Sequence, residues 1–260
     1  MSSAPHSPPR QPDGPSTNLT AYYDMAREGH FWIEWRFKVF LNLIESLGIP
    51  LASPRYGLDV GCGSGVVRRQ ILRHSSWRLD GVDIGEEAIR RCAQDDGSVW
   101  RYDVRECRSD LEARYDLAIL FDVLEHVAQP TAFLAAVAHH LKPGGWLFLN
   151  VPALPWLFGS YDRAQGHYRR YTRVAFRDDL PSDTFILQSM RYWGFSLVAL
   201  AAGRKLLPDS HRSPEEILVR GFEPPGRLLH RLLLAAMRVE TACLQSPPLG
   251  TSLMIAAMRR

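Results

Sequence analysis

The chain has 260 residues, which is enough to bury one sizeable core and slightly long for a single α/β domain. Hydrophobic residues make up 46% of the chain and charged residues 23%, the ordinary balance of a globular protein. The formal net charge of +3 is too small to imply a nucleic-acid partner, and no apolar run reaches the roughly 18 residues that span a bilayer. We therefore expect one globular domain with additions and no nucleic-acid partner.

The first 18 residues are rich in proline and serine and carry almost nothing apolar. Such a segment cannot bury enough surface to offset the entropy lost on ordering, so we expect residues 1–18 to be disordered and residues 19–260 to fold. The segment lacks the apolar stretch of a signal peptide. The four cysteines form no C-x-x-C pair, which favours reduced thiols in a cytoplasmic protein: Cys62, Cys92, Cys107 and Cys243.

Helices and strands are predicted to alternate from residue 22 onward. A helical stretch over Tyr22–Leu47 has apolar residues three to four apart. The predicted elements that follow are strands at Tyr56–Val60, Arg78–Asp83, Ser98–Tyr102, Tyr115–Phe121 and Trp146–Val151, with helices ending near His74 and spanning Glu86–Gln94 and Thr131–Leu141. This alternation predicts an α/β fold with a Rossmann-like, doubly wound sheet and a core over residues 55–151.

The pattern loosens after the fifth predicted strand. A long loop, Pro152–Arg173, precedes a predicted strand at Thr184–Tyr192. Two helical stretches, Trp193–Leu207 and Gly226–Leu244, and a last strand at Thr251–Met258 complete the chain. We expect a mostly parallel sheet with an antiparallel last strand, an N-terminal helix and C-terminal helical additions.

The strongest motif is the glycine-rich turn after the first predicted strand, Leu58-Asp-Val-Gly-Cys-Gly-Ser-Gly65. Gly61, Gly63 and Gly65 permit a sharp turn without Cβ clashes and let a ligand lie against the main chain. The helix that follows presents unpaired N–H groups where the sheet reverses direction. A ligand is therefore expected at the carboxyl end of this strand.

Acidic residues end the next two predicted strands. Asp83 follows the last glycine by 18 residues, near the spacing at which an acid accepts the ribose hydroxyls of an adenosine. Asp103 ends the third strand and is placed to meet the adenine amino group. The G-x-G-x-G spacing differs from the G-x-G-x-x-G of dinucleotide binders, so another adenosine-containing ligand is indicated.

These residues resemble motif I and the adenosine-binding acids of class I S-adenosylmethionine-dependent methyltransferases. The resemblance continues in Phe121–Val127, Leu141–Gly145 and Gly166–Tyr171. The last element, GHYRRY, is similar to that of a bacterial subgroup related to ubiquinone-pathway O-methyltransferases. The resemblance implies S-adenosylmethionine as cofactor, with these contacts: Tyr22, Arg36, Asp59, Gly61, Cys62, Gly63, Gly65, Asp83, Ile84, Asp103, Val104, Phe121 and Asp122.

Within this set the resemblance implies separate roles. Asp59 and the glycines hold the methionine portion, Asp83 the ribose, and Asp103 with Val104 the adenine. Tyr22 and Arg36 are expected to cap the pocket from the N-terminal helix. Arg36 either pairs with the methionine carboxylate, which a planar guanidinium suits, or belongs to a solvated helix face.

The implied chemistry requires a base, because the methyl donor is already activated and the enzyme must align the acceptor and remove its proton. His126 is the first candidate, since it follows the fourth predicted strand and its ordinary pKa suits proton removal at neutral pH. His167 is the second, on the long loop. Either histidine could instead only order its own loop.

Asp122, Glu125 and His126 have a second interpretation. They resemble the acid-x-x-Glu-His element that holds a divalent metal in some ubiquinone-pathway O-methyltransferases and small-RNA 2′-O-methyltransferases. Such ligands could hold Mg²⁺ or Zn²⁺. No further ligand is identifiable in the sequence, so we assign no metal site and expect activity to survive chelation.

Residues 152–250 are expected to supply a lid and an acceptor pocket. The long loop carries aromatic residues that could enclose an acceptor: Trp156, Phe158, Tyr161, His167, Tyr168 and Tyr171. It also carries basic residues that either bind an anionic group or are solvated: Arg163, His167, Arg169, Arg170 and Arg173. The C-terminal helices either cover the sheet or contact a membrane surface through their basic residues: Arg204, Lys205, Arg227, Arg231 and Arg238.

We therefore expect a cytoplasmic enzyme that transfers a methyl group from S-adenosylmethionine to a small-molecule acceptor, at oxygen. One alternative is methylation of a lipid-linked or glycosylated substrate at the membrane face. Another is a non-catalytic protein that binds the cofactor. An RNA methyltransferase is disfavoured by the low net charge and by the lack of an appended RNA-binding module.

Overall fold

The computed structural model describes residues 30–92, 97–205, 213–222, 226–244 and 246–260. The predicted disordered tail and Tyr22 lie outside these residues. Within them, no helix is long and apolar enough to cross a membrane.

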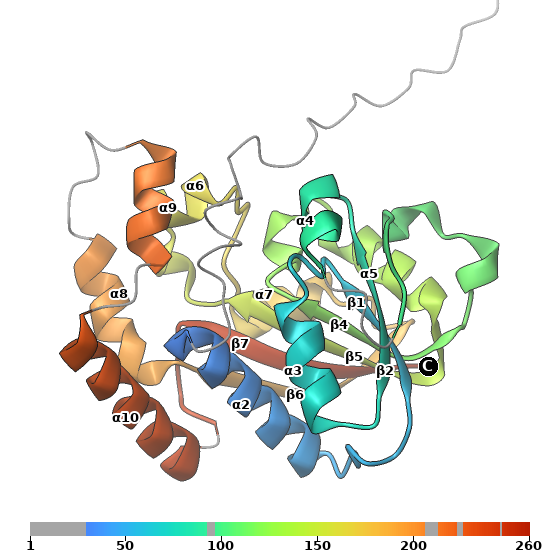
Figure 1. The fold of residues 1–260 in the computed structure, drawn as a ribbon, viewed down its shortest axis with the longest axis horizontal. Coiled ribbons are helices and arrows are strands. Elements are labelled where there is room, and N and C mark those ends of the chain that lie inside the picture. The colour runs from blue at the N-terminus through green and yellow to red at the C-terminus, as the bar shows by residue number, and fades with distance from the viewer. Residues whose placement is uncertain (1–29, 93–96, 206–212, 223–225, 245) are drawn as a thin grey trace, which may run out of the picture.

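A seven-stranded sheet forms the centre of the fold (Figure 1). Its strands stand in the order β3-β2-β1-β4-β5-β7-β6. Their bounds are β1 Tyr56–Val60, β2 Arg78–Asp83, β3 Val99–Arg101, β4 Tyr115–Phe121, β5 Leu141–Pro152, β6 Phe185–Trp193 and β7 Ser252–Arg259. The strands from β3 to β5 pair in parallel, and β7 runs antiparallel to both β5 and β6. The predicted α/β fold, with a mostly parallel sheet and an antiparallel last strand, is confirmed.

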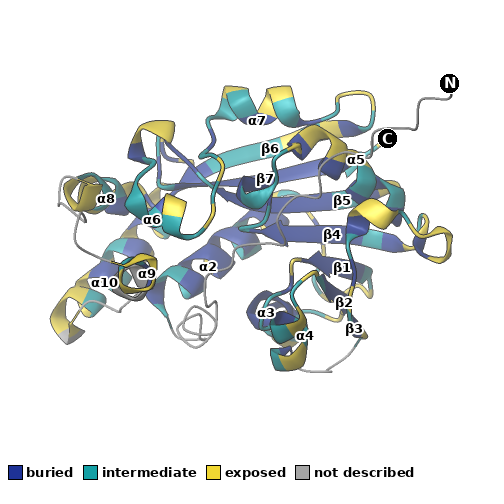
Figure 2. Ribbon diagram, turned by 90° about the horizontal axis from the view of Figure 1, so that it is seen from above, coloured by how far each residue is buried: buried dark blue, intermediate teal, exposed yellow. Residues whose placement is uncertain are grey.

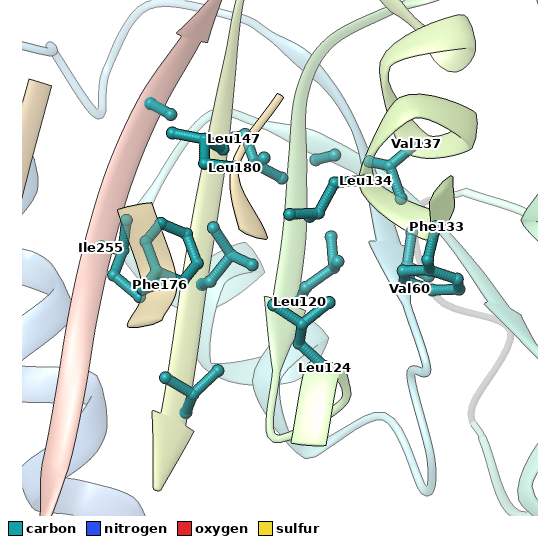
Figure 3. Packing of buried hydrophobic residues seen from close by; sticks show 14 of the residues in the cluster. Val60, Leu120, Leu124, Phe133, Leu134, Val137, Leu147, Phe176, Leu180 and Ile255 are labelled. Atoms are coloured by element: carbon teal, nitrogen blue, oxygen red, sulfur yellow. The ribbon is translucent and has the colours of Figure 1, made fainter. Parts of the chain in front are cut away.

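Helices cover both faces of this sheet (Figure 2), which explains why its central strands are continuous apolar runs. One face carries α2 (Phe31–Ser46), α3 (Val66–His74) and α10 (Arg227–Cys243), where Trp35 and Phe40 are fully buried. The other face carries α5 (Pro130–His140) and α7 (Arg173–Asp179). Figure 3 shows Leu134, Val137 and Phe176 of these helices among the strand residues of that core. Burying each such side chain contributes about 1.5–3 kcal/mol.

The structure differs from the sequence prediction around β5, which begins at Leu141 and not at Trp146. Tyr115 of β4 pairs with Leu141, whereas Leu117 pairs with Trp146, so residues 142–145 form an irregularity within the strand. The two glycines there allow this extra length, and Gly144 has a positive φ of 76°. The segment read as a helix-closing loop is therefore part of the sheet.

Three further differences concern the second half of the chain. Trp193 ends β6 instead of starting a helix, and α8 spans only Val198–Lys205 after a 3₁₀ turn at Phe195–Leu197. Two helices were not predicted, α7 and α9 (Pro214–Phe222). The long loop contains structure of its own, a 3₁₀ turn at Pro155–Leu157 and the short helix α6 (Ser160–Ala164). The predicted ends at Gln94 and Leu207 lie outside the described residues.

A buried carboxylate joins α10 to the start of α8. Glu240 accepts hydrogen bonds from the backbone N–H groups of Gly194, Phe195 and Ser196 at 2.8–3.0 Å, and from the Ser196 hydroxyl at 2.8 Å. These N–H groups stand at the N-terminal end of the 3₁₀ turn before α8, where the helix itself supplies no acceptors for them. The contact fixes how α8 and α10 sit against each other.

Candidate functional site

The glycine-rich turn between β1 and α3 adopts a backbone that L-residues with side chains avoid. Gly61, Gly63 and Gly65 have φ values of 70°, 54° and 77°. A Cβ at Gly61 would lie 2.6 Å from Val123, so the turn also needs glycine for close packing. Asp83, at the end of β2, accepts hydrogen bonds from the N–H groups of Gly63 at 3.0 Å and Gly85 at 2.8 Å. The structure thus brings the predicted ribose-binding acid onto the glycine turn.

Asp59 lies beneath this turn and is almost fully buried. Among the described residues its Oδ2 atom has no hydrogen-bond partner, and burial raises the pKa of its carboxyl group to about 8. A buried acid with an unpaired oxygen suits a cationic partner. The cradle therefore fits the α-ammonium group of the cofactor's methionine portion, and the methionine portion is what the family resemblance implies for Asp59. Cys62, in the same turn, is buried against Cys92 of the next segment.

The residues predicted to contact the adenine already make contacts within the protein. Asp103 precedes the 3₁₀ turn Val104–Glu106, and its carboxylate accepts hydrogen bonds from the backbone and guanidinium of Arg105. Although burial opposes it, these bonds lower the pKa of Asp103. The Val104 side chain is buried in the core, so only its main chain could reach a ligand. Ile84, beside Asp83, is 52% exposed and offers an apolar surface at the rim.

Arg36 of α2 crosses to the end of β4 and pairs with Asp122. Its guanidinium lies over the rings of Trp32 and Phe121, with centroid distances of 5.0 and 5.2 Å. The alternative that Arg36 belongs to a solvated helix face is wrong, because the residue is buried. Asp122 has a positive φ of 60° and also accepts a hydrogen bond from the Asn150 amide at 2.6 Å. The Arg36–Asp122 pair therefore closes one side of the site.

A histidine cluster lies next to Asp122. His126 ends the 3₁₀ turn Leu124–His126, and its ring meets that of His167 edge to face at 4.6 Å between centroids. The pKa of His126 is lowered to about 3 by burial and by the neighbouring His167, so its imidazole is neutral. The structure thus brings together the two candidate bases, which are 41 residues apart in sequence.

A second buried acid, Asp162, orients His167. Its Oδ1 atom lies 3.1 Å from Nδ1 of His167 and accepts a 2.7 Å hydrogen bond from Nε of Arg170. Its Oδ2 accepts a 2.9 Å hydrogen bond from the backbone N–H of Gly159. Although burial opposes it, the bonds from His167 and Arg170 lower the pKa of Asp162. Asp162 was not predicted to orient His167, although it stands only five residues before it on the same loop.

Glu125 is the third buried acid. It is 1% exposed, its Oε1 atom lies 4.0 Å from Nε2 of His167, and among the described residues its Oε2 atom has no partner. Burial and the nearby Asp122 raise the pKa of Glu125 well above its ordinary value. Both effects favour the protonated form of this carboxyl group.

Glu125, His126 and His167 present ligand atoms within 4.8 Å of one another. His167 of the GHYRRY element takes the place of Asp122, which pairs with Arg36, so the cluster offers three ligands and the expectation of no metal stays a prediction. One carboxylate and two imidazoles are donors that a divalent transition metal accepts. The donor set therefore fits such an ion, with Glu125, His126 and His167 as its ligands.

Asp122, Glu125 and His167 line a pocket of about 870 Å³, whereas His126 is not among its lining residues. Its walls come from the N-terminal end of α2, the ends of β4 and β5, the lid residues 157–170, α8 and α9. Phe158, Tyr161 and His167 line it as predicted, and so does Arg170. The prediction that Tyr171 encloses a ligand is wrong, because its side chain packs against Phe176 in the core.

Two other lid aromatics, Trp156 and Tyr168, are more than half exposed and are absent from the pocket lining. The basic residues of the lid likewise fall into those that line the pocket and those that do not. Arg163 and Arg170 line the pocket, whereas Arg169 donates to the backbone oxygen of Ala128 and Arg173 lies over the ring of Tyr192. The lid therefore supplies two of its arginines to the pocket.

Comparison with known proteins agrees with this geometry. Residues 32–200 match a family model described as a methyltransferase domain. The chain is 33% identical over 156 residues to the ubiquinone biosynthesis O-methyltransferase of Sodalis glossinidius, which covers 54% of this chain and 62% of that protein. It is 32% identical over 101 residues to the enzyme of the same name from Leptothrix cholodnii, covering 36% and 42%. The chain thus spans about half the length of these curated relatives.

Solved structures share the fold at low sequence identity. An S-adenosylmethionine-dependent methyltransferase from Mesorhizobium loti is 16% identical with a TM-score of 0.53, covering 90% of this chain and 99% of that one. The [4+2]-cyclase SpnF is 14% identical with a TM-score of 0.54, covering 85% and 80%. At these identities the likeness concerns the fold and not the reaction.

The family model covers well over half of the chain, and it spans the glycine turn, Asp83, the histidine cluster and the lid. The resemblance drawn from the sequence is thereby confirmed. The chain belongs to the methyltransferase domain family and has the fold of the class I S-adenosylmethionine-dependent methyltransferases.

Proposed function

We propose that this protein transfers the methyl group of S-adenosylmethionine to an oxygen atom of a small-molecule acceptor bound in the pocket. The observation that carries the proposal is His167, a pocket-lining imidazole held at Nδ1 by a buried carboxylate. The cofactor supplies a methyl group already activated on a sulfonium. The protein's own tasks are to align the acceptor oxygen and to take its proton.

His167 suits proton removal better than His126, reversing the order in which the sequence ranked them. Asp162 holds the Nδ1 side of His167, which leaves Nε2 on the side of Glu125, and His167 itself lines the pocket. A carboxylate placed in this way fixes the tautomer and stabilises the imidazolium that forms when the proton arrives. Among the described residues, His126 has a backbone hydrogen bond to Gly166 but no carboxylate placed in this way, and its low pKa makes it a weak base. Arg170 acts through Asp162 and is therefore a positioning residue.

In the proposed complex, different residues would contact different parts of the cofactor. In this proposal Asp59 faces the α-ammonium group, Asp83 the ribose hydroxyls, and the glycine turn lets the sulfonium portion lie against the main chain. The relatives named for ubiquinone biosynthesis support oxygen as the acceptor atom. The four cysteines are free, which supports a reducing, cytoplasmic location.

The cofactor site yields a prediction at Asp83. Replacing it by Asn keeps an acceptor for Gly63 but removes the charge that receives the ribose hydroxyls, so we expect affinity for S-adenosylmethionine to fall by about 1.5–3 kcal/mol. Isothermal titration calorimetry measures this loss. Glu87→Gln, at a half-exposed acid on α4 (Glu86–Arg91), should bind like the wild type. Unchanged affinity in Asp83→Asn would remove Asp83 from the ribose site.

Asp59 predicts a pH dependence of cofactor binding. Because its pKa is about 8 in the free protein, the carboxyl is protonated below that pH, and a bound ammonium group favours the ionised form. Binding should then release one proton, so log K rises by about one per pH unit between roughly pH 5 and 7.5. In Asp59→Asn the affinity should be weaker and free of this slope. Calorimetry in buffers of different ionisation enthalpy counts the proton directly, and absence of release in the wild type would contradict the assignment.

Replacing His167 is expected to lower turnover without weakening cofactor binding. His167→Gln should lower turnover at least about tenfold, roughly 1.4 kcal/mol of barrier, while cofactor affinity barely changes. His126→Gln serves as the neighbouring control and should change turnover less. Both quantities are measured on the same preparation, with methyl-labelled cofactor and a panel of hydroxylated aromatic acceptors. A larger loss in His126→Gln than in His167→Gln would reverse the assignment of the base.

The histidine cluster also fits a divalent metal, which when bound would lower the pKa of an acceptor hydroxyl. Two of the groups concerned already have partners within the protein, because Asp122 is paired with Arg36 and His167 is held by Asp162. We therefore expect turnover to persist after dialysis against EDTA. Loss of turnover that Mg²⁺ or Zn²⁺ restores in the wild type, but not in Glu125→Gln, would assign the cluster to a metal.

A further inference from the structure

The outer side of α10 exposes large apolar side chains along one face. Leu228, Leu232 and Val239 are 73%, 58% and 63% exposed. Their spacing of four and seven residues places them on the same side of the helix. Single exposed large apolar side chains are ordinary on a protein surface. A contiguous row of them instead marks a surface that a protein partner or a membrane covers.

This row cannot turn inward, because the opposite side of α10 is already fixed. Leu233 and Met237 are buried against the core residues of α2 and the sheet. Glu240, one turn further along, is held by the three backbone N–H groups before α8. The exposed face of α10 is therefore a permanent feature of this fold.

The charged residues of this face carry one sign. Arg231 and Arg238 lie beside the apolar row, each one residue before a member of it, and are exposed. Glu240 is the acidic residue of α10, and it is buried and engaged by backbone N–H groups. An apolar row bordered by arginines has the chemistry of a helix that lies in the interface of an anionic bilayer.

The same surface leads to the pocket. Figures 1 and 2 both show α8, α9 and α10 gathered at one end of the molecule. Leu200 of α8 is half exposed and also lines the pocket, and Phe195, just before α8, is 43% exposed. We name Phe195, Leu200 and the exposed face of α10 the α8–α10 surface. Exposed apolar side chains are thus found on α10, just before α8 and at the pocket, all at this end of the molecule.

We propose that the α8–α10 surface docks on the face of an anionic phospholipid bilayer, so that the pocket opens toward the headgroup region. The charge pattern favours this occupant over a second copy of the chain. A symmetric pairing through this face would place Arg231 and Arg238 near their own copies, with no exposed acid of α10 to receive them. Bilayer phosphates complement both arginines, and the acyl region receives the leucines.

Vesicle flotation of the full chain tests the proposal. The wild type should float with vesicles of phosphatidylcholine and phosphatidylglycerol, bind phosphatidylcholine alone far less, and dissociate as salt is raised. We expect the partition coefficient onto these vesicles to fall at least about tenfold in each of two double variants. They are Arg231→Glu/Arg238→Glu and Leu228→Ser/Leu232→Ser. Val174→Ser removes an equally exposed apolar residue from α7 and should float like the wild type.

Folding and self-association are checked on the same samples. Each variant should keep the wild-type melting temperature and affinity for S-adenosylmethionine, since none of these residues belongs to the site. Flotation that is independent of phosphatidylglycerol, or equal in the wild type and both double variants, overturns the proposal. So does a solution mass of two chains for the wild type that Leu228→Ser/Leu232→Ser reduces to one, because the face would then join two copies.

Discussion

The candidate site depends on one buried carboxylate, that of Asp162. Its two oxygens hold His167, Arg170 and the backbone of Gly159, so that three points of the lid converge on a single side chain. Without it, the lid would lose the contact that turns the imidazole of His167 toward the pocket. The cost of burying this charge is offset by hydrogen bonds to both oxygens, which is the condition under which buried acids persist.

A second set of contacts connects the site to the sheet. Arg36 of α2 meets Asp122 at the end of β4, Asp122 accepts from Asn150 of β5, and Asn150 accepts from the indole of Trp193 at 2.8 Å. The chain of contacts runs from a helix on one face through the carboxyl ends of two strands to the end of β6. It explains why a helix preceding the sheet takes part in the site, as the family resemblance implied for Arg36.

The sheet was predictable from the sequence because its signals are local. Each central strand is a short apolar run bounded by glycine, proline or acidic residues, and the glycine turn after β1 is recognisable from its spacing alone. The helix α9 was missed although its signal is also local. Ser213 and Glu216 form reciprocal side-chain-to-backbone hydrogen bonds at 2.9 and 3.2 Å, the capping box that S-x-x-E predicts. Thr172 similarly caps α7 through the N–H of Ala175.

The convergence of Glu125 with His167 could not be predicted in this way. The two residues are far apart in sequence, and only the path of the lid back across the end of β4 brings them together. The backbone N–H of Tyr168 donates to the carbonyl oxygen of Glu125 at 2.8 Å, which fixes that path. Local patterns give the residue types of a site, whereas contacts of this kind decide which of them meet.

The central claim is that the cofactor cradle and the pocket meet at one reaction point beside His167. A crystal structure of the protein with S-adenosylhomocysteine tests it most directly. The account predicts ribose hydroxyls on Asp83, the ammonium group on Asp59, and the sulfur atom facing the pocket near Asp122 and His167. A sulfur atom directed away from the pocket, or separated from it by side chains that the ligand does not displace, would contradict the account.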